Sequence, residues 1–222
     1  MKQVCQTCHA ERSRSIPLLF MSYRAPLAEL VGTFLLTIGV MLSIAAGTNS
    51  VLATAVVAGF TLMICVYTIG NISGSHINPA VTLSLLSGGK ISSQNALIYI
   101  ICQVLGAILA VVVAGLLTST PVSFEGVSGT FDIPTFFTEA LGALFFLFGI
   151  SAVVWGKVND AFHGFVVGGS LLLGIMLSAH AGGLGILNPA VALGVGAFNL
   201  ATVAGPIVGG ILGVILYRAL VD

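Results

Sequence analysis

Long apolar stretches alternate with short polar breaks along most of the chain. A helix that crosses a bilayer needs about 20 mostly apolar residues, and the stretches reach about that length. Glycine, proline and polar residues mark the breaks between them, as at residues 47–50 and 156–160. The pattern predicts an all-α membrane protein with six transmembrane helices, at residues 26–46, 51–70, 95–118, 134–156, 161–180 and 201–221.

The composition supports this prediction and removes the main alternatives. Of the 222 residues, 57% are hydrophobic and 6% are charged, whereas an ordinary soluble domain has about 25% charged residues. Intrinsic disorder would need low hydrophobicity, and a formal net charge of +0 offers no basic surface for nucleic acid. The spans leave no room for a soluble catalytic domain, so we expect neither an enzyme nor a cofactor.

The distribution of basic residues predicts the orientation in the membrane. All seven Lys and Arg residues fall on one side of the predicted topology, and the other side holds Glu125 and Asp132. Basic residues concentrate in the cytoplasmic loops of membrane proteins. We therefore expect a multi-pass protein of the plasma membrane with both termini in the cytoplasm. The basic residues are Lys2, Arg12, Arg14, Arg24, Lys90, Lys157 and Arg218.

Residues 1–24 are expected to form a cytoplasmic N-terminal tail. Cys5, Cys8 and His9 form a C-x-x-C-H pattern, which is typical of c-type haem attachment and can also be half of a zinc site. Haem attachment of this kind occurs outside the cytoplasm, opposite to the predicted side. The remaining cysteines fall inside predicted spans, so no second ligand pair completes a zinc site. We therefore expect no metal and no haem.

The chain contains an internal repeat. The sequence Asn-Pro-Ala-Val at 78–81 returns at 188–191, and 188 − 78 = 110. The same offset relates Glu29 to Glu139. Each copy holds three spans, an odd number, so the two copies must insert in opposite directions, as in folds with inverted repeats. The predicted repeats are residues 25–118 and 134–221.

A short apolar segment follows each Asn-Pro-Ala sequence, at residues 78–87 and 188–198. These segments are too short to cross a bilayer. Asn is a good N-cap and Pro suits the first helical position, so each motif predicts the start of a half-helix. The glycine-containing residues before it are expected to be re-entrant backbone, which is tolerated at membrane depth where it lines a cavity.

These features together resemble the aquaporin, or major intrinsic protein, family. Residues 70–82 resemble the first signature of that family, and residues 205–210 resemble its last helix. The resemblance covers residues 25–221. It implies an aquaporin-like channel domain over 25–222, with six transmembrane helices, two re-entrant half-helices and a homotetramer with one pore per subunit.

The half-helices predict how such a pore works. Each helix N-terminus carries roughly half a positive charge, so two opposed N-termini at the midplane would repel cations. Each capping Asn has amide N–H groups that can donate to a passing oxygen atom. The midplane residues are expected to be Asn78, Pro79, Ala80, Asn188, Pro189 and Ala190.

Main-chain carbonyls before each motif are expected to supply acceptors along the pore. A neutral solute could exchange its water hydrogen bonds for these, whereas so few dipoles cannot replace the hydration shell of an ion. We expect His76 to lie beside the pore in a neutral hydrogen-bonded role or as a pH gate. The carbonyls belong to Ser73, Gly74, Ser75, His76, Gly183, Leu184, Gly185 and Ile186.

Glu29 and Glu139 are ionisable residues inside predicted spans, where such groups have a functional role by default. One reading is a proton or ion relay. The reading that we favour is structural, with each carboxylate accepting hydrogen bonds from the re-entrant backbone of its own repeat, and the family resemblance implies the same.

The outer constriction departs from the family pattern. Family members usually place an Arg three residues after the second Asn, and Val191 stands there. Counting from the motifs puts the other lining positions at Ala58, Met176 and Gly185, with the fifth-span position dependent on the length of the following loop. The constriction is therefore expected to be wide and apolar, and to pass solutes larger than water.

The sequence favours a passive channel for water and small uncharged solutes such as glycerol or urea, with the lipid bilayer as its surroundings. One alternative is an ion-coupled secondary transporter that uses Glu29 and Glu139. Another is a closed-pore structural membrane protein. Flux measured across a series of solutes separates the three readings.

Overall fold

 The computed structural model describes residues 23–47, 50–118, 128–129 and 131–221. The C-x-x-C-H pattern, most of the expected tail and Glu125 lie outside these ranges, so the expectations for them stay untested.

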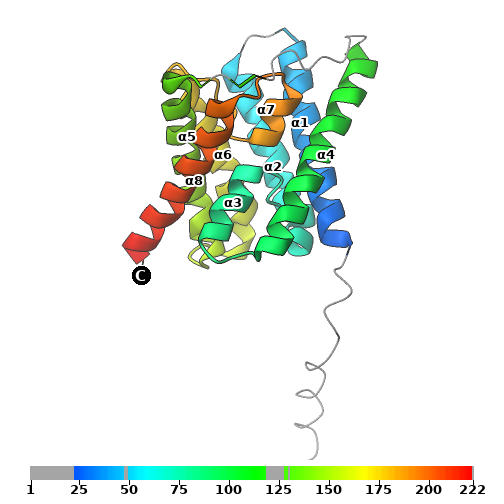
Figure 1. Cartoon of the computed structure of the whole chain (residues 1–222). Coiled ribbons are helices and arrows are strands. Elements are labelled where there is room, and N and C mark those ends of the chain that lie inside the picture. Colours follow the sequence, from blue (N-terminus) through cyan, green and yellow to red (C-terminus); the bar gives the residue numbers. More distant parts are fainter. Residues whose placement is uncertain (1–22, 48–49, 119–127, 130, 222) are drawn as a thin grey trace, which may run out of the picture.

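Six long helices form the body of the molecule, and they confirm the predicted all-α membrane fold (Figure 1). Each is long and apolar enough to cross a membrane. Their bounds lie within about three residues of those expected from the sequence. The helices are α1 (Arg24–Ala45), α2 (Val51–Ser73), α4 (Ser93–Thr118), α5 (Ile133–Val154), α6 (His163–His180) and α8 (Leu200–Val221).

Two short helices lie between the long ones, α3 (Pro79–Ser87) and α7 (Pro189–Gly194). In Figure 1, α3 occupies the lower half of the bundle and α7 the upper half. A single turn of 3₁₀ helix, η1 (Asp160–Phe162), precedes α6. The two half-helices therefore enter the bundle from opposite ends, as the odd number of spans in each repeat requires.

The packing of the helices repeats in the same way. Helix α1 packs against α4 in the first half of the chain, and α5 packs against α8 in the second. Each half-helix contacts the last long helix of the other half, α3 against α8 and α7 against α4. Helices α2 and α6 pack against each other and join the two halves.

Glycines allow the close helix contacts within each half. A Cβ atom on Gly106 of α4 would collide with the carbonyl oxygen of Leu30 in α1. A Cβ atom on Gly209 of α8 would collide with the carbonyl oxygen of Ala140 in α5. Small residues let helix backbones approach closely in lipid, and these two contacts occupy matching places in the two repeats.

Helix α7 ends at Gly194, four residues before the end expected from the apolar pattern. The amide of Gly196, at φ 70°, donates to the carbonyl of Leu193, and the amide of Ala197 donates to that of Ala192. This pair of bonds is a Schellman motif, which ends a helix at a residue in the left-handed region. The same motif ends α3 at Gly89.

Candidate functional site

The two half-helices begin in the same way. The side-chain oxygen of Asn78 accepts a hydrogen bond from the amide of Ala80 at 2.8 Å, and that of Asn188 accepts from the amide of Ala190 at 3.0 Å. A proline follows each Asn at the first helical position, where its missing N–H costs nothing. Each Asn-Pro-Ala sequence is therefore an N-cap that fixes the start of a helix inside the bundle.

The capping residues also bind each other's segments. The amide nitrogen of Asn78 donates to the carbonyl of Leu187 at 2.9 Å, and that of Asn188 donates to the carbonyl of Ile77 at 3.1 Å. The N-termini of α3 and α7 consequently face each other across these two bonds. Each amide has a second N–H group, and the two helix dipoles point their positive ends at the same place.

Glu29 of α1 holds the first re-entrant segment. Its carboxylate accepts hydrogen bonds from the hydroxyl of Ser73 at 2.6 Å and from the amides of His76 at 3.0 Å and Ile77 at 2.6 Å. The side-chain amide of Gln103 in α4 donates to it at 2.8 Å. The residue is fully buried, so these donors replace the hydration that its charge loses.

Glu139 of α5 holds the second segment in the same manner. Its carboxylate accepts from the hydroxyl of Ser178 at 3.2 Å and from the amides of Gly185 and Leu187, both at 2.7 Å. The amide of Ile186 donates to both carboxylate oxygens, at 3.1 and 3.2 Å. Among the described residues, neither Glu139 nor Glu29 forms a salt bridge, and both carboxylates serve as main-chain anchors.

The anchored segments adopt an unusual backbone at matching positions. Ser75 and Ile77 have φ angles of 52° and 41°, and Gly185 and Leu187, each 110 residues later, have φ angles of 68° and 55°. Left-handed backbone is costly for residues other than glycine and persists only where the surroundings enforce it. The hydrogen bonds to the two glutamates provide that enforcement.

Most carbonyls of these segments remain available. Within the described ranges, no hydrogen bond ends on the main-chain oxygens of residues 74–76 or 183–186. The carbonyl of Ser73 differs, because it accepts a hydrogen bond from the hydroxyl of Tyr99 at 2.9 Å. Of the eight carbonyls expected to line a pore, this is the one already engaged with a protein donor.

A cavity of about 560 Å³, lined by both polar and aliphatic side chains, opens on the α3 side of the Asn pair. We call it the α3-side vestibule. The first re-entrant segment forms part of its wall, and charged residues from both halves of the chain contribute. Its polar side chains are Tyr67, Asn71, Ser73, Ser75, His76, Lys90, Asp160 and His163.

The hydrogen-bond network assigns the tautomer of His76. The hydroxyl of Thr82 donates to the carbonyl of Asn78 at 3.0 Å, and the side-chain amide of Gln103 donates to the same hydroxyl oxygen. The Nδ1 atom of His76 lies 3.2 Å from this oxygen. Because the hydroxyl proton is already used, Nδ1 is the donor. A neutral His76 then has Nε2 as an acceptor on the vestibule side.

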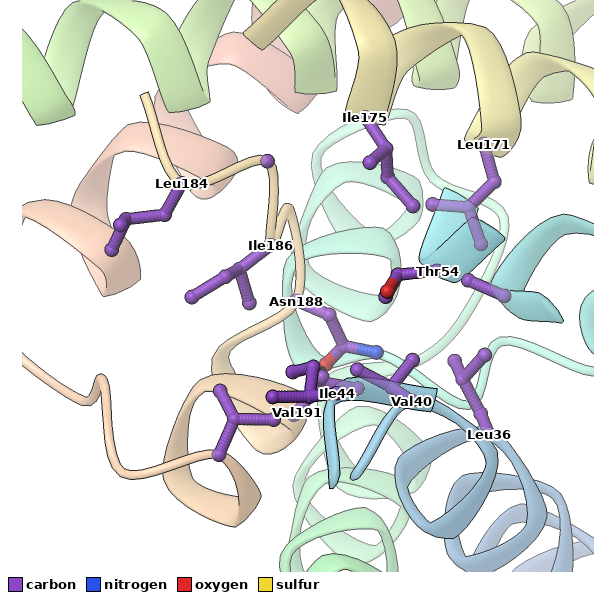
Figure 2. A pocket seen from close by; sticks show the side chains of 13 residues that line it. Leu36, Val40, Ile44, Thr54, Leu171, Ile175, Leu184, Ile186, Asn188 and Val191 are labelled. Atoms are coloured by element: carbon purple, nitrogen blue, oxygen red, sulfur yellow. Dashed lines mark hydrogen bonds between the residues drawn. The ribbon is translucent and has the colours of Figure 1, made fainter. Parts of the chain in front are cut away.

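A smaller cavity of about 70 Å³ lies on the α7 side of the Asn pair, and we call it the α7-side cavity (Figure 2). Asn188 contributes to its wall, whereas almost all the other side chains are aliphatic. The full lining is Leu36, Val40, Ile44, Thr54, Ala58, Leu171, Ile175, Leu184, Gly185, Ile186, Asn188, Val191 and Val195.

Three of the four positions expected at the outer constriction line this cavity, namely Ala58, Gly185 and Val191. Met176 is not in the lining, and its neighbour Ile175 is. A Cβ atom on Gly185 would lie 3.2 Å from the Cγ2 atom of Ile175, so these two residues are direct neighbours. The residue of α6 in the lining is therefore one position before the one counted from the motif, and a turn with hydrogen bonds at Gly182 and Gly183 separates α6 from the second re-entrant segment.

The contribution of α1 was not predicted from the sequence. Leu36, Val40 and Ile44 recur every four residues along that helix and form one stripe of the α7-side cavity. The spacing was visible in the sequence, but apolar residues also occupy other sides of α1, so the pattern did not single out this stripe. These side chains and Leu171 of α6 are larger than Ala58 and Gly185, and they add to the apolar wall of the cavity.

Comparisons with known proteins agree with this geometry. Residues 18–217 match the family model described as major intrinsic protein. The chain is 33% identical to aquaporin Z of Rhodopseudomonas palustris, over 87% of this chain and 92% of that one. It is 35% identical to glycerol uptake facilitator protein-like 6 of Lactiplantibacillus plantarum, over 77% of this chain and 82% of that one.

The fold is also similar to a solved structure. The X-ray structure of the aquaglyceroporin from Plasmodium falciparum superposes with a TM-score of 0.66, over 88% of this chain and 94% of that one, at 19% sequence identity. The paired half-helices, the six spans and the match over most of the chain lead to one assignment. The chain belongs to the major intrinsic protein family, whose members are membrane channels and not enzymes.

Proposed function

We propose that this channel conducts water and small uncharged solutes, such as glycerol or urea, passively through a pore in each subunit. The observation that carries the proposal is the meeting of two helix N-termini, with a spare amide N–H on Asn78 and on Asn188. A neutral solute accepts hydrogen bonds there, whereas a cation meets two positive dipole ends.

The proposed path runs from the α3-side vestibule, past the Asn pair, into the α7-side cavity. The unoccupied carbonyls of residues 74–76 and 183–186 supply acceptors on the two sides of the pair. The α7-side cavity is the apolar outer constriction, formed by Ala58, Gly185, Val191 and, in place of Met176, Ile175. Among the described residues that line it there is no Arg or Lys, so exclusion of cations rests on the midplane dipoles.

We also propose the orientation and assembly. Arg24, Lys90, Lys157 and Arg218 all fall at the α3 end of the bundle by helix order, which supports cytoplasmic termini and a cytoplasmic α3-side vestibule in the plasma membrane. The tail over 1–24, the channel domain over 25–222 and a homotetramer complete the proposal, the last supported by family membership.

Stopped-flow measurements on proteoliposomes test this function. We expect flux of water, glycerol and urea that rises linearly with the gradient and does not depend on a pH gradient. Saturable, proton-dependent flux would instead identify a transporter that uses Glu29 and Glu139. Folded protein that adds no permeability to the vesicles would identify a closed-pore structural protein.

A further inference from the structure

We propose that a groove between α3 and α8 binds one phospholipid of the cytoplasmic leaflet, with an acyl chain along α8 and an anionic headgroup at Arg218. The proposal goes beyond conduction, and it rests on the orientation proposed above, in which the α3 end of the bundle is cytoplasmic. We call this cavity the α3–α8 groove. Its volume is about 300 Å³, and its lining is Ser87, Gly88, Ile211, Val214, Ile215, Arg218 and Ala219.

The α3–α8 groove lies on the outside of the bundle, where the end of α3 packs beside the last turns of α8 (Figure 1). Ser87, Arg218 and Ala219 are exposed, and Ile215 is 56% exposed. The described residues that line the groove do not overlap with those that line the α3-side vestibule. The groove is therefore separate from the proposed path, and in a bilayer the molecules that surround it are lipids.

Polarity changes along the groove as it does along a phospholipid. Ile211, Val214 and Ile215 recur at helical spacing on one face of α8, and Arg218 lies on the same face one turn closer to the cytoplasmic end. Ile211 and Arg218 are two turns apart, which is about 10 Å along the helix. An acyl chain packed along the isoleucines consequently places its headgroup at the guanidinium.

The charge at the polar end of the groove favours an anionic headgroup. The five N–H donors of Arg218 form a planar fork that matches phosphate oxygens, so the side chain can bind a phosphate while it keeps another contact. Among the described residues that line the groove there is no Asp or Glu. Basic pockets between helices on the cytoplasmic side are typical sites for anionic lipid headgroups.

Trp155 lies directly behind the groove and brings a second cation close to it. A Cβ atom on Gly88 would lie 2.9 Å from the Cη2 atom of Trp155. The Cζ atom of Arg218 lies 6.0 Å from the centroid of this ring, and the Nζ atom of Lys90 lies 4.3 Å from it. Two cations thus share one aromatic ring, and both attract a negative headgroup.

The fluorescence of Trp155 tests the proposal, because it is the single tryptophan of the chain. Bromine atoms quench indole fluorescence at close range. The full-length protein is reconstituted in phosphatidylcholine with a small share of a lipid brominated near the headgroup end of one chain. We expect brominated phosphatidylglycerol to quench with an apparent affinity about fivefold higher than that of brominated phosphatidylcholine, the ratio that one basic residue near the membrane surface supplies.

Substitutions of Arg218 locate this preference. Arg218→Gln should abolish the fivefold ratio, and Arg218→Lys, which keeps the charge, should retain at least half of it. Arg24→Gln is the matched control, since Arg24 is an exposed basic residue at the start of α1, at the same end of the bundle and outside the groove. It should leave the ratio unchanged. Circular dichroism spectra check that each variant keeps its helices.

The unmodified protein decides the proposal even without the variants. Equal quenching by the two brominated lipids overturns it, and so does a ratio that survives Arg218→Gln. A ratio that falls equally in Arg24→Gln would assign the attraction to the overall surface charge and would also overturn the site. Displacement of the lipid by soluble glycerol phosphate would assign the groove to free phosphate instead. None of these readouts measures flux, so they stand apart from the test of conduction.

Discussion

The two sides of the Asn pair share one backbone design and differ in their lining. On each side a buried glutamate holds a re-entrant segment whose positive φ angles recur 110 residues apart. Yet the α3-side vestibule is large and has polar and charged groups among its aliphatic side chains, whereas the α7-side cavity is small and mostly aliphatic. The two halves of the chain thus share the groups that hold the main chain in place, and they differ in the side chains that line the two cavities.

The anchors themselves show a smaller difference. Glu29 receives a side-chain amide from Gln103 of α4. The offset of 103 that aligns Gly106 with Gly209 places Pro206 of α8 at the matching position, and a proline has no group to donate. Glu139 is instead held by main-chain amides and by Ser178. Each carboxylate accepts several hydrogen bonds, and the two halves supply these bonds from different donors.

Removal of an anchor is the largest change that we predict. Glu139→Leu should lower the free energy of unfolding by at least about 3 kcal/mol, because it leaves three amides of the second segment without an acceptor, two of them buried. Glu29→Leu should have a similar effect on the first segment. Thermal unfolding of the purified protein measures both, with Leu141→Ala, at an exposed position of α5, as the control. A loss below about 1 kcal/mol for either glutamate would contradict equal anchoring.

A positive charge introduced at position 191 should make the lining of the α7-side cavity more like the usual family pattern, in which an Arg stands there. Val191→Arg should reduce glycerol flux at least tenfold by occupying the cavity, and should lower any cation current by its charge. Val191→Met is the control for size without charge. Stopped-flow and current recordings give the two readouts. Zero cation current in both the unmodified and the Arg channel would show that the missing Arg has no part in ion exclusion.

Loss of Gln103 should affect the first half alone. Gln103→Met removes the donor to Glu29 and Thr82, whereas its Oε1 atom is buried without a partner in the described structure. We expect a loss of about 1–2 kcal/mol, measured by thermal unfolding. Pro206 lies at the matching place in α8 and makes no such bond. Its substitution therefore should not cause an equivalent loss of stability in the second half. A change as large as that of Glu29→Leu would mean that Gln103 is the main support of the segment.

The smallest effect concerns the start of α5. The side chain of Thr135 and then its amide, which donates to the Asp132 carboxylate at 2.8 Å, lower the pKa of Asp132. A lowered pKa contributes stability that is present above the ordinary Asp value and is lost as the pH falls through the lowered one. Asp132→Asn keeps a cap without a charge, so its melting temperature should lack this pH dependence. Identical pH profiles would show that the charge contributes nothing.

The sequence predicted the six spans and the two helix starts because both depend on local signals, namely apolar length and the Asn-Pro pair. It also suggested the partners of Glu29 and Glu139, since a buried carboxylate needs donors and the re-entrant backbone offers them. The lining was harder to predict. Whether Ile175 or Met176 lines the cavity, and whether the stripe from Leu36 does, depends on how α6 and α1 are rotated in the bundle, and apolar residues on several sides of these helices leave that rotation undetermined by the sequence pattern.

The exchange of hydrogen bonds between Asn78 and Leu187 and between Asn188 and Ile77 spans 109 and 111 residues of chain. During synthesis the first half is completed long before its partner exists. Until the second half enters the bilayer, the amide of Asn78 and the carbonyl of Ile77 lack the groups that finally satisfy them. The contacts at the centre of the channel therefore cannot be completed until both halves are in place.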